Sequence, residues 1–282
     1  MMRRLPLPAV VVAGALALAA SGCSLATTRM QRALDPSMER AMAAASYLQS
    51  AAGITADARR LIRSDGYVYL SDIGPQLRYL ATTGDSSSYG SLRRFAEREM
   101  VRRDATGFAA RLRFRQDAPF EVATPFATLR FTEALALGWR TLGDTASAML
   151  AARMAPVTPV GGQRTETDVA AEECVNAEVS LASNPLAGAA LLRRFRRYDG
   201  SKDLHAESQL GLRGRDASLV ALSCLTRVSL TLGDPDAAVR HLDRLLGRLD
   251  PLLAKSGRPD PGAASDALLT LRQALGAGPR YR

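Results

Sequence analysis

The sequence predicts an all-α protein in which helical hairpins are arranged as an α/α toroid, partial or irregular, with at most a short β-hairpin. Three observations lead to this fold class. Apolar residues recur every three or four positions along most of the chain after residue 35, as in amphipathic helices. Glycine followed by aspartate separates expected helices at three places. These turns are 59 and 90 residues apart (144 − 85 and 234 − 144), and such uneven spacing favours a toroid over a uniform 34-residue repeat array.

The N-terminus has the three parts of a secretory signal. Arg3 and Arg4 give a basic start, an apolar run extends to Ala20, and small residues precede Cys23. A spanning helix needs about 20 apolar residues with suitable flanks, and this run is too short. We therefore expect residues 1–22 to be a cleaved signal peptide.

The residues around the expected cleavage site, Ala20, Ser21, Gly22 and Cys23, resemble the lipobox of bacterial lipoproteins, in which the first residue is usually Leu. The resemblance implies that the Cys23 thiol receives a diacylglyceryl group and anchors the protein to a membrane. Two or more acyl chains hold a protein stably. We expect a lipidated tether over 23–34 and one helical domain over 35–282, outside the cytoplasmic membrane, on either the cell membrane or an outer membrane. The alternative is a secreted protein with a chance cysteine.

Charge and composition exclude several functions. The formal charge of +9 becomes +7 when Arg3 and Arg4 leave with the signal, and a basic surface is attracted to anionic headgroups. Nucleic acid is not expected as a partner outside the cytoplasm. The two histidines, His205 and His241, fit no zinc spacing, and there is no phosphate-binding loop or nucleophile elbow. We therefore expect no cofactor and no metal.

Two cysteines remain after Cys23, namely Cys174 and Cys224. An exported protein meets oxidising conditions, so an even pair predicts a disulfide. The alternative is a pair of buried free thiols, because cysteine also packs as a small apolar residue. The sequence slightly favours the disulfide.

The apolar pattern divides the body into helices with one β-prone region. Residues 67–70 are β-prone, and alternation of arginine with apolar residues over 108–115 predicts a short strand with one buried face. The clearest helix opens at Thr124 and Pro125 and places one apolar face along its length. The helix over 216–232 is apolar nearly all round, which is typical of a buried helix. The expected helices cover approximately 36–52, 56–63, 71–83, 92–100, 125–142, 144–154, 165–183, 185–197, 216–232, 235–249 and 263–275.

The three glycine–aspartate turns have a simple chemical basis. Gly84, Gly143 and Gly233 each follow a predicted helix and are each followed by aspartate. Glycine adopts the left-handed conformation that ends a helix, and the aspartate accepts hydrogen bonds from the free amides that open the next helix. The sequence therefore predicts tight αα-hairpins at these positions.

The order of features from Asp65 to Leu150 resembles the six-hairpin, α/α-toroid glycosidases of the glycoside hydrolase family eight type. The parallels are an Asp-Gly-Tyr segment at 65–67, Ser71 and Asp72 opening a helix, the Gly-Asp turn at 84–85, the strand at 111–115, and the helix opening at 123–130 that runs on to Glu133. The likeness covers about a third of the chain. The resemblance implies a glycosidase-like body that binds an envelope polysaccharide.

The departures from this pattern bear on catalysis. The acid of the resembled enzymes falls on Asp72, and their second acidic residue falls on Ala127 or Thr128. Glycoside hydrolysis needs two carboxyl groups across the bond, so the pair is incomplete unless Glu133 or another residue replaces the missing member. Asp72 also has a structural interpretation, since an acidic residue in the first turn of a helix is favoured by the dipole.

The sequence leaves three functions open. The first is non-catalytic glycan binding, with Tyr67, Tyr69 and Phe126 as candidates for stacking on sugar rings, although core packing is the commoner fate of such residues. The second is a helical scaffold for envelope protein assembly, with an unknown protein partner. The third is an active glycan hydrolase with relocated carboxylates, for which Asp72 and Glu133 are the catalytic candidates.

Overall fold

The computed structural model describes residues 28–51, 56–101, 107–113, 123–153, 173–174, 176–178, 190, 214–254 and 259–277. The expected signal peptide, Cys23 and His205 lie outside these residues, as do most of the helices expected over 165–197. Within the described ranges, no helix is long and apolar enough to cross a membrane.

The described residues are mainly helical, with one two-stranded sheet, which confirms the all-α class. In order, the elements are η1 (Asp35–Ser37), α2 (Met38–Ala51), η2 (Ala58–Leu61), β1 (Tyr67–Tyr69), α3 (Leu70–Thr83), α4 (Ser86–Glu99), β2 (Arg111–Arg113), α5 (Pro125–Leu142), α6 (Thr145–Arg153), α9 (Gly214–Leu232), α10 (Pro235–Ala254) and α11 (Pro261–Ala277). Residues 28–34 are also helical, so helix begins within the segment expected to be tether.

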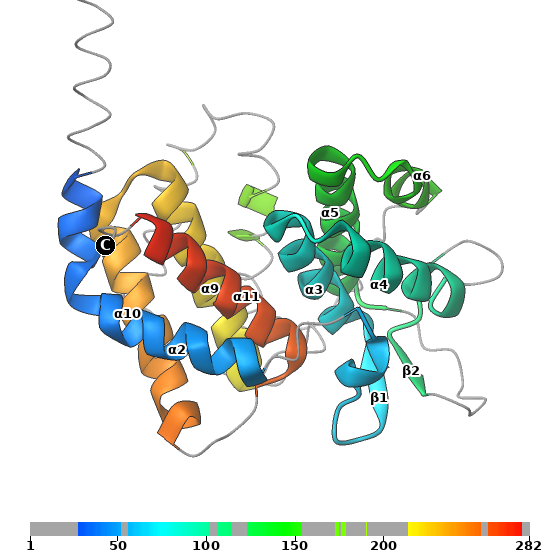
Figure 1. Cartoon of the computed structure of the whole chain (residues 1–282), viewed down its shortest axis with the longest axis horizontal. Coiled ribbons are helices and arrows are strands. Elements are labelled where there is room, and N and C mark those ends of the chain that lie inside the picture. Colours follow the sequence, from blue (N-terminus) through cyan, green and yellow to red (C-terminus); the bar gives the residue numbers. More distant parts are fainter. Residues whose placement is uncertain are drawn as a thin grey trace, which may run out of the picture.

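The helices form an inner row and an outer layer (Figure 1). The inner row runs α9, α11, α3, α5, and each helix in it contacts the next. The outer layer consists of α10 on α9, α2 on α11, α4 on α3 and α6 on α5. This arrangement of inner helices backed by outer helices is that of a partial α/α toroid.

The inner helices are parallel. At their N-terminal ends, the Gly262 amide of α11 donates to Asp72 Oδ1 of α3 at 2.9 Å. Near their C-terminal ends, the Thr141 hydroxyl of α5 donates to the Ala81 carbonyl of α3 at 3.3 Å. All four N-terminal ends therefore lie at one end of the molecule, together with β1 and β2, and the C-terminal ends lie at the other (Figure 1).

The expected turns are present. Gly84, Gly143 and Gly233 have φ of 77°, 69° and 69°, the left-handed region that glycine tolerates without strain. Asp85 accepts from the Ser88 amide, and Asp234 accepts from the Ala237 amide, at 3.0 and 3.1 Å. At the Gly143 turn the Asp144 side chain accepts from the Ser147 hydroxyl, and the Ser147 amide donates to the Asp144 carbonyl. Each glycine thus ends a helix as predicted, and the predicted side-chain cap to a backbone amide is present at Asp85 and Asp234.

The small sheet pairs β1 with β2 in antiparallel register, Tyr67 opposite Arg113 and Tyr69 opposite Arg111. Val68 is fully buried behind it. The strand expected over 108–115 is confirmed over its described central part. The helix expected over 56–63 is instead a short 3-10 turn, η2, which is capped by the Asp57 side chain.

Candidate functional site

Charged side chains meet where the inner helices converge. Arg78 comes from α3, Arg227 from α9 and Asp266 from α11, and Glu178 from a described helical segment between α6 and α9. Each side chain is at most 14% exposed. With two residues of α5, they form what we call the central charge cluster: Arg78, Arg130, Glu133, Glu178, Arg227 and Asp266.

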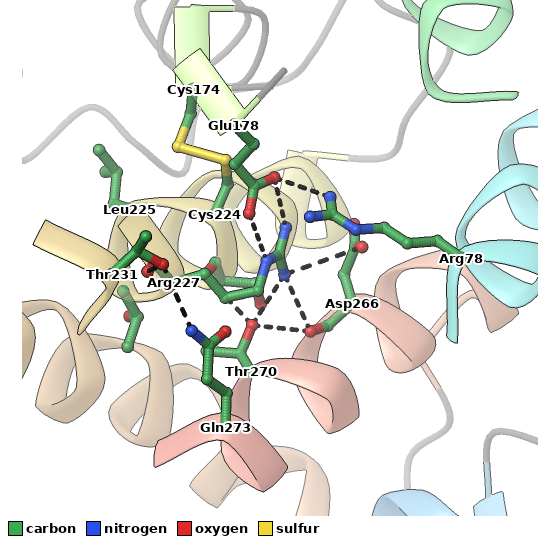
Figure 2. A network of polar contacts seen from close by, with 12 residues as sticks. Arg78, Cys174, Glu178, Cys224, Leu225, Arg227, Thr231, Asp266, Thr270 and Gln273 are labelled. Carbon is green, nitrogen blue, oxygen red and sulfur yellow. Dashed lines mark hydrogen bonds and ion pairs between the residues drawn. A yellow bond between two sulfur atoms is a disulfide. The ribbon is translucent and has the colours of Figure 1, made fainter. Parts of the chain in front are cut away.

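Glu178 is held by two guanidinium groups (Figure 2). Arg227 donates from Nε to Oε1 at 2.7 Å and from Nη2 to Oε2 at 3.0 Å. Arg78 donates from Nη1 to Oε2 at 2.7 Å. Because both oxygens of Glu178 accept charge-assisted hydrogen bonds, the carboxylate is fixed in orientation.

The other members of the cluster extend this network. Arg227 Nη1 donates to the Thr270 hydroxyl at 2.8 Å and to the Asp266 carbonyl at 3.2 Å (Figure 2). Arg130 forms an ion pair with Asp266. Three arginines thus face three acidic residues, as the burial of charge requires.

The two glutamates have opposite pKa shifts. Burial raises the pKa of Glu133, against the opposing effect of Arg78, whose Nη1 lies 3.5 Å from Glu133 Oε1. Burial also disfavours the charge on Glu178, but Arg227 and Arg78 outweigh it and lower the pKa of Glu178 to about 2. Glu178 is therefore the firmly ionised member of the pair.

A pocket of about 300 Å³ opens beside this cluster. It lies towards the C-terminal ends of the inner helices, since Thr82, Arg140, Thr231 and Gln273 are all in the last two turns of their helices. Its lining mixes charged, hydroxyl, amide and apolar side chains and comprises Arg78, Thr82, Glu133, Leu137, Arg140, Glu178, Arg227, Val228, Thr231, Leu269 and Gln273.

The disulfide between Cys174 and Cys224 places Glu178 in this pocket. The two cysteines are bonded, with their Cα atoms 5.8 Å apart, which agrees with the favoured interpretation of the sequence. Cys174 precedes Glu178 by four residues, and Cys224 precedes Arg227 by three. One turn of helix separates neighbours at these spacings, so the bond sets the segment with Glu178 against Arg227 of α9 (Figure 2).

Asp72 lies at the opposite end of the inner helices from the pocket. Its side chain is 1% exposed and accepts from Arg63 Nε and Nη2 at 2.7 and 2.8 Å. Burial raises the pKa of Asp72, with Arg63 acting against it, although a helix dipole alone would lower the pKa. Arg63 also binds Asp260, so these charges join the start of α3 to the start of α11.

Of the three stacking candidates, Phe126 is buried, and Tyr67 and Tyr69 are half-buried with a guanidinium over the ring. Phe126 is 1% exposed and lies beneath Arg130. The guanidinium of Arg111 lies 4.7 Å from the Tyr67 ring centre, and that of Arg63 lies 4.3 Å from the Tyr69 ring centre. None of these aromatic residues lines the pocket.

Of the sequence-predicted candidates, Glu133 alone lines the pocket. The sequence patterns did not point to Arg78, Glu178, Arg227 or Asp266. A signal for Arg227 existed, because a charge within a helix that is apolar nearly all round must find a buried partner. Across the residues with described positions, no group of three or more His, Cys, Asp or Glu side chains is arranged to hold a metal ion.

Comparison with known proteins gives a distant structural likeness. No family model and no curated protein sequence matches the chain. A solved structure described as a novel alpha-amylase from Clostridium perfringens is similar over 73% of this chain and 87% of its own, with 11% identity and a TM-score of 0.47.

Proposed function

We propose that the protein is a lipid-anchored lipoprotein of the cell envelope that binds a glycan in the central pocket without cleaving it. The observation that carries the proposal is the pocket itself, which is a concave site beside the central charge cluster, lined by both apolar and charged side chains. Such a site, with few polar groups fixed in position, is where small ligands bind.

The lining suits a ligand rich in hydroxyl groups. Arg140, Gln273 and the hydroxyl of Thr82 or Thr231 offer donors and acceptors around the opening, and Leu137, Val228 and Leu269 offer apolar contact. Arg140 is exposed, and its guanidinium can reach a ligand without breaking an ion pair with any described residue. A sugar ring presents both hydroxyl edges and apolar faces, and both would be accommodated.

The state of the carboxylates supports binding over hydrolysis. A glycosidase needs one carboxyl group to donate a proton and a second that contacts the sugar or a water molecule. Both oxygens of Glu178 are occupied by Arg78 and Arg227. Releasing them would break three charge-assisted hydrogen bonds to buried guanidinium groups, which is costly.

Hydrolysis is the second candidate because of one observation. Glu133 and Glu178 line the same pocket, and their pKa values are shifted in opposite directions. A carboxyl pair of this kind can divide acid and base roles. This candidate requires a ligand that displaces Arg78 from Glu178.

The test is a binding screen of the soluble body, residues 24–282, against envelope and plant glycans, with product analysis on the same samples. We expect binding without cleavage, weakened about tenfold or more by Arg140→Ala, since one charge-assisted hydrogen bond contributes about 1.5–3 kcal/mol and each 1.4 kcal/mol is about a factor of ten in affinity. Arg98→Ala is the matched control, because Arg98 is 74% exposed and lies outside the pocket.

Each outcome separates the candidates. Cleavage that is lost in Glu133→Gln would establish the hydrolase. No binding to any glycan would contradict the proposal and favour a scaffold for protein assembly.

Anchoring has its own test. Cys23→Ala should release the mature body from membranes or leave an uncleaved precursor, because no acyl chain can then be attached. Membrane fractionation and intact mass measure this, and an unchanged result for both would contradict lipidation.

A further inference from the structure

The pocket and the N-terminal helix lie at the same end of the molecule. The pocket is lined by Thr231 of α9, which ends at Leu232. Arg29, at the start of the helical residues 28–34, lies 3.6 Å from Asp236 in the first turn of α10. Only a short turn separates α9 from α10, so the first described residues are beside the C-terminal end of α9, at the end of the molecule where the C-terminal ends of the inner helices lie (Figure 1).

The N-terminal helices are fixed to the body along α10. Asp236, Asp243 and Asp250 are spaced by seven residues and lie on one side of that helix. Ser37 donates to Asp243 at 2.6 Å, and Arg40 donates to Asp250 at 2.7 Å. Leu34 and Met38 are buried in the core. Residue 28 therefore has a defined place on the body.

The chain between Cys23 and residue 28 is short. Five residue steps span at most about 17 Å when fully extended. The inner helix α9 has 19 residues and is about 28 Å long. A lipid on Cys23 can thus hold the C-terminal ends of the inner helices at the membrane, but the tether is too short to run along the body and hold the opposite end there.

We propose that the pocket faces the membrane that anchors the protein and takes an acidic saccharide carried by a membrane lipid. This rests on the proposed glycan binding and on lipidation of Cys23. The volume of about 300 Å³ is at the lower end of the range for ligand sites, which suits a headgroup of one or two sugar rings. The charges of the central charge cluster balance, and Arg140, which is exposed and lines the pocket, adds a positive charge to it, which favours a negatively charged group.

Orientation is tested with the lipidated protein in phosphatidylcholine vesicles. Ser87→Cys and Ser64→Cys are a matched pair of exposed serines. Ser87 lies just after the turn that ends α3, and Ser64 lies just before β1. Each variant is labelled with a fluorophore, and the vesicles carry a quencher on the lipid headgroup. We expect loss of fluorescence at position 87 and little loss at position 64. Equal loss, or greater loss at position 64, overturns the proposal even if soluble glycans bind.

The ligand is tested by adding to the vesicles a glycolipid with a uronic acid headgroup, or a neutral glycolipid in its place. We expect the anchored protein to bind the acidic glycolipid, and Arg140→Ala to weaken this binding while Arg98→Ala does not. If the protein binds the free acidic saccharide but not the acidic glycolipid, the proposal that the saccharide is carried by a membrane lipid is overturned. If neither the acidic glycolipid nor the free acidic saccharide binds, and the fluorescence experiment gives the expected orientation, the proposed glycan function itself is wrong.

Discussion

Individual charges in the central charge cluster determine how the stability of the fold responds to pH. The pKa of Glu178 is lowered from 4.5 to about 2 in the folded protein. A lowered pKa adds stability above the unfolded value of 4.5, and this stability is lost as the pH falls towards 2. The contribution is of the order of 3 kcal/mol.

We therefore expect Glu178→Gln to lower the thermal midpoint most at pH 7, and the gap from wild type to narrow as the pH falls below 4.5. Thermal melts over this pH range measure the gap. If the difference between the thermal midpoints of wild type and Glu178→Gln did not change with pH, the lowered pKa of Glu178 would be contradicted. If the variant does not fold, the carboxyl carbon shift of Glu178 in the wild type reports the same titration.

Asp72 gives a second prediction at this scale, because its contacts are those of a structural residue. Asp72→Asn replaces one acceptor oxygen with an amide nitrogen that cannot accept from Arg63 or from the Gly262 amide, so the free energy of unfolding should fall by about 2 kcal/mol. Asp236→Asn, at a carboxylate with 69% exposure, should change it little. Glycan binding should be unaffected by either substitution. Loss of glycan binding in Asp72→Asn alone would show that Asp72 belongs to the binding site.

At the scale of elements, close helix packing depends on glycine at one contact. A Cβ atom on Gly138 of α5 would collide with the ring of Tyr89 from α4. The Tyr89 hydroxyl bonds with Ser147 at 2.8 Å, so the ring cannot move without losing that bond.

Gly138→Ala should therefore destabilise the fold by about 1–3 kcal/mol. Gly247→Ala is the matched control, because a Cβ there meets nothing within 4 Å and alanine favours a helix interior by up to about 1 kcal/mol. Chemical denaturation measures both variants. Equal effects of the two substitutions would contradict the packing argument.

The sequence predicts local elements better than the site. The turns at Gly84, Gly143 and Gly233 follow from chemistry within a few residues, and all three are confirmed. The central charge cluster joins residues far apart in the chain, since Arg78 and Glu178 are 100 residues apart. No local spacing reports such a contact. Glu133 was a candidate replacement for the missing second carboxyl group, and its pocket depends on helices that the sequence could not place beside it.

For the whole molecule, the disulfide between Cys174 and Cys224 links the stability of the fold to oxidising conditions. Removal of a native disulfide costs about 2–5 kcal/mol in small exported domains. We expect Cys174→Ser with Cys224→Ser to melt at a lower temperature and to bind glycans more weakly, because Glu178 lies one turn from Cys174. In the wild type, both cysteines should resist alkylation until the disulfide is reduced. Ready alkylation without reductant would contradict the bond.

The contact between α3 and α11 has a consequence for the order of folding. Asp72 and Gly262, which meet at this contact, are 190 residues apart in sequence. Contacts between such distant residues slow folding, and an incompletely folded chain exposes apolar surface. Because synthesis runs from the N-terminus, the start of α3 exists long before its partner on α11. The pair of Arg63 and Asp72 therefore gains its contacts with Asp260 and Gly262 only when the last helix has been made.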